Sequence, residues 1–88
     1  MPSQAPRQIT QIVGENIAAA RQAAELTQRE VAEQVGALVE GSKLSPTDVS
    51  RWERGGIEPG AKYRQALAAV LFDGDLSAMY VEHESAAA

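Results

Sequence analysis

The stretch Ser45-Pro46-Thr47-Asp48-Val49-Ser50-Arg51-Trp52-Glu53-Arg54-Gly55 predicts a short helix with signals for its start and its end. Ser45 is a favoured N-cap residue, and Asp48 follows it at the spacing of a capping box. Pro46 suits the first helical position, because the N–H that it lacks would have no partner there. Gly55 suits the position just after a helix, where the left-handed conformation is common.

This predicted helix has one apolar side and one side rich in hydrogen-bond donors. Val49 and Trp52 lie three residues apart and share the apolar side. Trp52 is the only tryptophan, and its spacing predicts a core anchor rather than a base-stacking group. The other faces carry donors that can reach phosphates or base edges, on Thr47, Ser50, Arg51 and Arg54. An anchored helix with a row of outward donors is suited to reading the major groove of DNA.

A second capping signal lies upstream, in Thr27-Gln28-Arg29-Glu30. Thr27 is the predicted N-cap and Glu30 stands at the third helical position. Apolar residues follow at helical spacing, namely Val31, Ala32 and Val35. Two short capped helices in succession, each with a small apolar face, form the pattern of a helix-turn-helix.

Two segments of the chain resemble the two halves of the phage repressor and Cro class of DNA-binding domain. They are Thr27-Gln28-Arg29-Glu30-Val31-Ala32-Glu33-Gln34-Val35-Gly36 and Val49-Ser50-Arg51-Trp52-Glu53-Arg54-Gly55. The resemblance covers roughly residues 13–80. It implies an all-α, compact five-helix domain of the lambda-repressor type, with an enlarged turn between the second and third helices. It also implies a sequence-specific transcriptional regulator of double-stranded DNA, from a phage or a bacterium.

The resemblance assigns expected roles to individual residues. Base contacts fall on Thr47 and Arg51, and on Pro46, which can contact at most a thymine methyl group. Among the expected phosphate ligands, Gln28 matches a phosphate-contacting position of the family. The others are expected from their donor side chains alone, namely Arg29, Lys43, Ser45, Ser50 and Arg54. Arg21 and Glu53 match positions that form an ion pair between the first helix and the end of the third. They complete an expected structural set with Trp52 and Val49.

The order of elements along the chain is expected to be simple. A flexible arm at residues 1–8 precedes one domain at 9–81, and a disordered acidic and alanine-rich tail follows at 82–88. The first helix has an apolar period that runs through about Ala24. The glycine- and proline-bearing segment 55–60 predicts a break. A fourth helix is marked by Tyr63, Leu67, Val70 and Leu71, and a short fifth by Leu76, Met79 and Tyr80.

The turn between the two motif helices departs from the family pattern of about three or four residues. Residues 37–43 add about seven, of which Leu38 and Val39 can extend the second helix while Gly41-Ser42 reverses the chain. One interpretation is a tolerated loop insertion, because lengthening a surface loop costs little free energy. The other is a wing in which Lys43 contacts a phosphate. We favour the loop insertion.

Composition excludes several other classes of protein. With 88 residues, of which 44% are hydrophobic, the chain can close one small core but not two. It contains no cysteine, so a disulfide or a thiolate zinc site is excluded. No apolar run reaches the length of a membrane span, and the N-terminus lacks the apolar core of a secretion signal. We therefore expect a cytoplasmic protein of a bacterial cell.

The net charge of −4 opposes the expectation that a DNA-binding protein is basic. The acidic surplus lies at the C-terminal end, on Asp73, Asp75, Glu82 and Glu84. Residues 1–72 carry eight basic and eight acidic side chains and are therefore balanced. The field at the contact face matters more than the total charge, so the balance predicts weak non-specific binding rather than none.

An enzyme, a metal site and a cofactor are not expected. His83 is the lone histidine, and no nucleophile or carboxylate pair has catalytic spacing around it. The alternative function is a protein-binding adaptor or antitoxin-type module on the same scaffold. For DNA binding we expect a homodimer on a pseudo-palindromic operator. Its self-association surface is predicted from Leu76, Met79, Tyr80 and Val81, which can instead complete the core.

Overall fold

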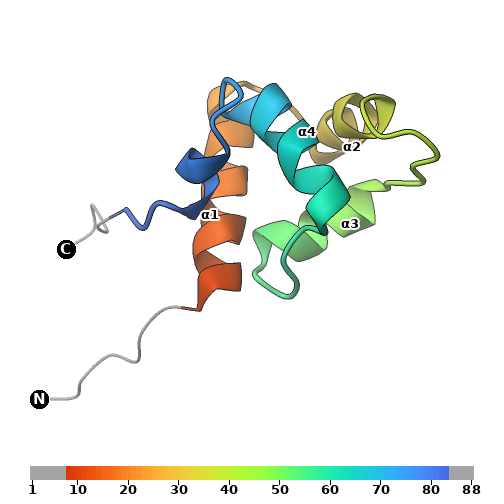
Figure 1. The fold of residues 1–88 in the computed structure, drawn as a ribbon. Helices are drawn as coiled ribbons and strands as arrows, with labels where there is room; N and C mark the ends of the chain where they lie inside the picture. Colours follow the sequence, from red (N-terminus) through yellow and green to blue (C-terminus); the bar gives the residue numbers. More distant parts are fainter. Residues whose placement is uncertain (1–7, 84–88) are drawn as a thin grey trace, which may run out of the picture.

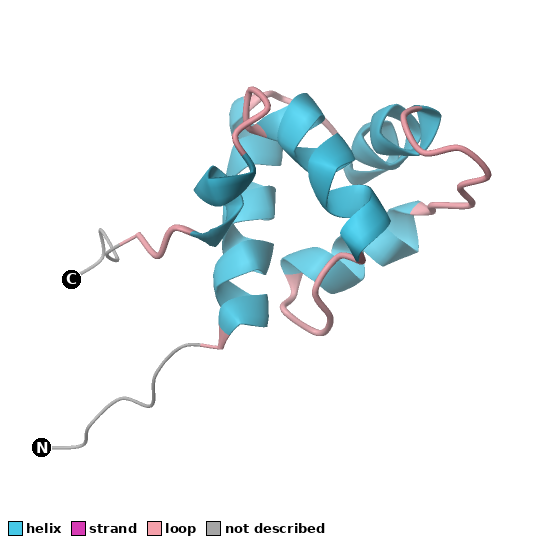
Figure 2. Cartoon of the chain, in the orientation of Figure 1, coloured by secondary structure: helices cyan, strands magenta, loops and turns pink. Residues whose placement is uncertain are grey.

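The computed structural model describes residues 8–83, and the two ends of the chain lie outside this description. Figure 1 shows the described part as a bundle of short helices. Its elements are α1 (Ile9–Ala23), α2 (Gln28–Ala37), α3 (Pro46–Glu53), α4 (Ala61–Leu71) and the 3-10 helix η1 (Leu76–Tyr80). No strand occurs within this range, as Figure 2 shows. The expected all-α fold class is confirmed.

The fifth element differs from the expectation, because it is a 3-10 helix rather than a fifth α-helix. It spans only five residues, from Leu76 to Tyr80. Asp75 caps its start by accepting hydrogen bonds from the Ser77 N–H at 3.1 Å and the Ser77 hydroxyl at 2.6 Å. Segments this short commonly take the tighter 3-10 geometry. The domain is therefore built from four α-helices and one 3-10 turn.

Both motif helices begin with the capping box that the sequence predicts. The Thr27 hydroxyl accepts from the Glu30 N–H at 3.0 Å, and the Glu30 carboxylate accepts from the Thr27 N–H at 2.9 Å. Ser45 and Asp48 repeat the arrangement at the start of α3. Gly55 follows α3 with a φ of 75°, in the left-handed region expected for a helix-ending glycine. Local sequence thus fixes where α2 and α3 begin and where α3 ends.

The ends of the domain fit the expected arm and tail only in part. Gln8, which the sequence groups with the arm, is the N-cap of α1, and its N–H donates to the Gln11 side chain at 3.2 Å. Residues 1–7 lie outside the described residues, as do residues 84–88 of the expected tail. Glu82 and His83 are described and exposed. The expected arm and tail therefore remain predictions.

The core lies where α1, α3, α4 and η1 meet, with α2 closing it against α3 and α4. Trp52 is 5% exposed, and its ring lies 5.7 Å from that of Tyr63 on α4, at an interplanar angle of 48°. The buried cluster contains Val13, Ile17, Val31, Ala32, Val35, Val49, Trp52, Ala66, Leu67 and Met79. Every α-helix and η1 contribute to it, so α3 is held by packing on several sides.

At Gly14 the backbone of α1 lies very close to the backbone at the end of α3. A Cβ atom built on Gly14 would overlap the carbonyl oxygen of Trp52 and lie 2.9 Å from that of Glu53. Both obstacles are backbone atoms, which cannot swing aside as a side chain can. Gly14 is therefore the residue that lets the backbone of α3 rest directly on α1.

The segment after α4 returns to α1 and is held there by Asn16. This buried side chain donates from Nδ2 to the carbonyl oxygens of Met79 and Val81, at 2.8 Å each. Tyr80 donates from its hydroxyl to the Glu58 carboxylate at 3.0 Å. Burial raises the pKa of Tyr80, and the hydrogen bond to Glu58 raises it further, so the phenol stays a donor.

This packing changes the expectation for self-association. Met79 is fully buried, and Leu76 and Tyr80 pack against the core. Met79 therefore completes the core and is not available as a surface. Leu76 and Tyr80 are only partly buried, so a dimer surface that includes them remains a prediction. Of the predicted set only Val81 is exposed, at 47%.

The turn between α2 and α3 runs from residue 38 to residue 45, and Figure 2 shows it projecting at the side of the domain opposite α1. Contrary to the expected extension, α2 ends at Ala37, and Leu38 is 59% exposed. Gly41 reverses the chain with a φ of 72°. Ser42 then ties the turn to the body, since its hydroxyl lies 3.3 Å from that of Tyr63 and accepts from the Leu44 N–H at 3.2 Å.

Candidate nucleic-acid interface

The outer face of α3 is a stripe of polar side chains. Thr47, Arg51 and Arg54 lie at helical spacing, and all three are exposed. Pro46 is exposed at the first helical position, and Ser50 is half-buried beside the stripe. Val49 and Trp52, on the opposite side, are buried. The helix thus presents its donors outward while its apolar side holds it to the core.

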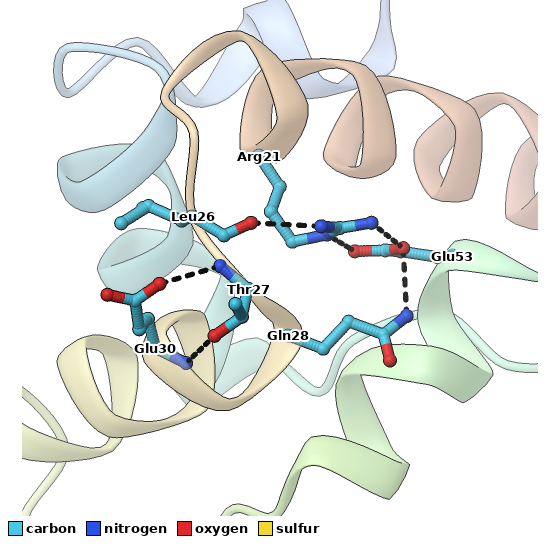
Figure 3. Close-up of polar contacts among 6 residues, drawn as sticks. All are labelled: Arg21, Leu26, Thr27, Gln28, Glu30 and Glu53. Carbon is cyan, nitrogen blue, oxygen red and sulfur yellow. Dashed lines mark hydrogen bonds and ion pairs between the residues drawn. The ribbon is translucent and has the colours of Figure 1, made fainter.

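A hydrogen-bonded network ties α1, α2 and α3 together, as Figure 3 shows. The Glu53 carboxylate accepts from Arg21 Nε at 2.6 Å and from Arg21 Nη2 at 3.1 Å. It also accepts from Gln28 Nε2 at 3.0 Å. Arg21 donates further to the carbonyl oxygen of Leu26, at 2.9 Å. One carboxylate therefore fixes the start of α2 and the end of α3 relative to α1.

The Arg21–Glu53 pair is largely removed from water. The Arg21 and Glu53 side chains are 16% and 8% exposed. The hydrogen bond to Glu53 raises the pKa of Arg21, and the charge of Glu53 adds to it against the opposing effect of burial. A bidentate pair of this kind fixes geometry, whereas its desolvation offsets much of the attraction. The pair thus positions α3 more than it adds to stability.

Gln28 stands at the first position of α2, where backbone N–H groups have no intrahelical partner. Its amide is half-buried because it donates to Glu53. Arg29 is next along the helix and exposed. This end of α2 combines the positive end of the helix dipole with the cation Arg29, and both favour an anion such as a phosphate, whereas the Glu30 carboxylate in the same turn opposes one. The network joins it directly to α3.

Two other expected phosphate ligands lie away from this end of α2. Lys43 is exposed in the turn, three residues before α3. Ser45 is half-buried and committed to the cap, since its hydroxyl donates to Asp48 Oδ2 at 3.0 Å. To contact a phosphate, this hydroxyl would have to give up its bond to Asp48.

Sequence reasoning missed the roles of Gly14 and Asn16, and it described Asp48 only as a capping residue. Gly14 allows α3 to pack closely against α1, and Asn16 holds the C-terminal segment by hydrogen bonds, as described above. Asp48 lies on the rim of the stripe, where it adds a carboxylate beside Arg51. A glycine and an asparagine inside a helical pattern are detectable signals, because both are unfavourable there without a tertiary role. The partner of each lies far along the chain and has no local signal.

Other kinds of site have no support in the described part of the chain. No three histidine, cysteine, aspartate or glutamate side chains among residues 8–83 gather closely enough to hold a metal ion. Within the same residues, no helix combines the length and the apolar character needed to cross a membrane.

A protein-family model for the helix-turn-helix, of the lambda repressor and Cro-like kind, matches residues 17–72. The matched segment runs from within α1 to the end of α4 and covers more than half of the chain. The chain therefore belongs to this helix-turn-helix family, whose members are DNA-binding regulatory domains and not typically enzymes. No curated protein and no solved structure matched the chain.

The network centred on Glu53 gives a first testable prediction. Glu53→Gln keeps one acceptor oxygen but turns an amide towards the Arg21 donors. We expect a loss of ~1–3 kcal/mol in the free energy of unfolding, because a largely buried charged donor loses its partner. Urea denaturation followed by circular dichroism measures the loss. Glu33→Gln is the matched control, since Glu33 is exposed on α2. Equal denaturation midpoints for the two variants would contradict the role of Glu53.

Proposed function

We propose that the protein is a sequence-specific regulator that binds double-stranded DNA and inserts α3 into the major groove. The observation that carries the proposal is the exposed stripe of Thr47, Arg51 and Arg54 on a helix whose other side is anchored by Val49 and Trp52. In this proposal Arg51 contacts guanine O6 and N7, and Thr47 contacts a neighbouring base edge. Pro46 adds at most an apolar contact with a thymine methyl group.

The phosphate contacts of this proposal flank the reading helix. Gln28 and Arg29 at the start of α2 hold one phosphate, and Arg54 at the end of α3 holds another. Ser50 and Lys43 supply further donors, while Ser45 contributes mainly through the cap. Few cations face the DNA, so affinity is modest at physiological salt and falls further as salt is added.

The proposed assembly is a homodimer on a pseudo-palindromic operator, in the cytoplasm of a bacterial cell or its phage. One such domain reads only a few base pairs, so two half-sites about one helical turn, ~34 Å, apart supply adequate specificity. The repressor or Cro-like role follows from the family. Met79 is in the core, so the proposed dimer contact rests on the exposed Val81 and on Leu76 and Tyr80, which are partly buried.

Selection from a pool of random duplexes tests the proposal. Full-length protein should enrich one short motif, present as an inverted repeat if the dimer forms. Capture of DNA without sequence enrichment would overturn the proposal of a specific regulator. Sedimentation of the protein with the selected duplex gives the number of protein chains bound.

Arg51→Ala should relax base preference at one position of each half-site. The variant loses a bidentate contact with guanine, so we expect a loss of ~1–3 kcal/mol on the selected site and almost none on duplexes that lack that guanine. Titration of both duplexes by fluorescence anisotropy measures the difference. Uniform weakening across sequences would instead make Arg51 a phosphate ligand.

Arg29→Ala is the matched comparison for Arg51→Ala, because it removes the same charge from an exposed position at the start of α2. A phosphate contact carries no base information, so this variant should weaken binding to all duplexes alike and reduce the salt dependence.

A protein-binding adaptor or antitoxin-type module is the second candidate. It is favoured by the exposed Leu38 on the enlarged turn and by the net charge of −4. Single exposed apolar residues are common on soluble domains, so the observation is weaker than the donor stripe. Absence of enrichment from the random pool, together with recovery of one protein partner, would support this candidate instead.

A further inference from the structure

Asp48 is a carboxylate at the edge of the proposed reading face, in the first turn of α3. Its Oδ2 atom accepts from the Ser45 N–H at 2.9 Å and from the Ser45 hydroxyl at 3.0 Å. Within residues 8–83 no donor is bonded to Oδ1. The cap therefore holds the carboxylate in one orientation while leaving one oxygen available.

Arg51 lies three residues after Asp48 on α3, so the two side chains are neighbours on the helix surface. Both side chains line an open cavity of about 240 Å³ between α3 and the loop before α4. Its other walls are Leu44, Trp52, Ile57, Glu58, Gly60 and Tyr63. Among the described residues, no hydrogen bond or ion pair engages the Arg51 guanidinium. Two residues three apart on α3 thus border the same open space, one with a carboxylate held by the cap and one with an uncommitted guanidinium.

A carboxylate at this place is unfavourable beside DNA phosphates unless it receives a donor. In the major groove only the amino groups at cytosine N4 and adenine N6 donate, and aspartate is matched to cytosine N4. The N-terminal residues of a recognition helix are those that reach base edges. Three residues rise about 4.5 Å along a helix, close to the 3.4 Å step between base pairs. Neighbouring bases are therefore within reach of Asp48 and Arg51.

We propose that Asp48 is a specificity-determining residue, whose Oδ1 accepts a hydrogen bond from cytosine N4 one base-pair step from the guanine read by Arg51. The proposal rests on the function proposed above. Asp48 is the acceptor for the cytosine and Arg51 is the bidentate donor to the guanine, so together they read two adjacent base pairs. Asp48 also makes binding to the wrong sequence unfavourable, because its charge then faces groove acceptors and phosphates without compensation.

The test is selection from a random duplex pool with wild-type protein, Asp48→Asn and Glu33→Gln. The wild-type motif should contain a cytosine next to the Arg51-dependent guanine, preferred roughly tenfold over other bases. Asp48→Asn keeps an acceptor oxygen for the Ser45 cap but gains an NH₂ group. At the position next to the guanine, this variant should prefer adenine instead of cytosine. Its preference for the guanine itself should be unchanged. Glu33→Gln removes the same charge from an exposed site on α2 and should leave the motif unchanged.

Each other outcome overturns the proposal. If Asp48→Asn enriches the wild-type motif and binds all duplexes more tightly, Asp48 is only a cap and a repulsive charge. If the wild-type motif has the guanine but no cytosine preference beside it, the Asp48 contact is absent while the proposed function stands. If wild-type protein enriches no motif, the proposed function fails and the Asp48 contact fails with it. A melting temperature equal to that of wild type shows that Asp48→Asn is folded.

Discussion

Replacement of Gly14 by alanine is expected to lower the melting temperature of the domain by roughly 10–20 °C. The added Cβ overlaps the carbonyl oxygen of Trp52 and lies 2.9 Å from that of Glu53, so α3 must move away from α1. Overpacking costs up to ~3 kcal/mol, and occasionally more, when the obstacle is backbone. For a domain of this size ~1 kcal/mol corresponds to about 4–8 °C. Thermal unfolding followed by circular dichroism measures the shift.

Gly36→Ala is the matched control for this substitution. Gly36 is also a helical glycine, near the end of α2, but the nearest atoms, on Ser42 and Leu44, would lie 3.6 and 3.9 Å from an added Cβ, which is ordinary contact. Alanine has the higher helix propensity by up to ~1 kcal/mol, so Gly36→Ala should be neutral or stabilising. Similar melting temperatures for Gly14→Ala and wild type would show that the close approach of α1 and α3 can relax.

Trp52→Ala should remove ~3–5 kcal/mol from the free energy of unfolding, because it leaves a large cavity between α3 and α4. Trp52 is 5% exposed and packs against the Tyr63 ring. Small domains have only ~5–15 kcal/mol of stability in total, so the variant is close to unfolded at room temperature. Urea denaturation gives the loss directly. DNA binding should fall as the folded fraction falls.

Leu38→Ala serves as the control for Trp52→Ala, since it removes an apolar side chain that is 59% exposed. Exposed substitutions of this kind usually change stability by less than ~0.5 kcal/mol. A Trp52→Ala protein that kept its melting temperature while losing DNA affinity would mean that Trp52 contacts DNA rather than the core.

The elements whose ends carry local signals could be predicted from the sequence. Thr27 with Glu30, and Ser45 with Asp48, encode the starts of α2 and α3 within four residues, and Gly55 encodes the end of α3. The all-α class and the family follow from the same residues. The extension of α2 that Leu38 and Val39 allow does not form, since α2 ends at Ala37 and the turn leaves Leu38 exposed.

Contacts between distant residues could not be predicted in the same way. Nothing near Gly14 indicates that the backbone of α3 will rest on it, and nothing near Asn16 indicates its bonds to Met79 and Val81. Apolar and aromatic residues such as Leu76, Met79 and Tyr80 occur both in cores and in contact surfaces. Only the fold shows how far each of them is buried. The base and phosphate contacts of α2 and α3 remain predictions.

The two hydrogen bonds from Asn16 bear on how the domain opens and closes. They join the last described turn of the chain to the middle of α1, the helix on which α3 rests. Met79, in the same 3-10 turn, is fully buried in the core. The turn therefore cannot detach without exposing apolar surface. The C-terminal turn and the reading helix therefore belong to one cooperative unit, in which fraying at the chain end is coupled to global unfolding.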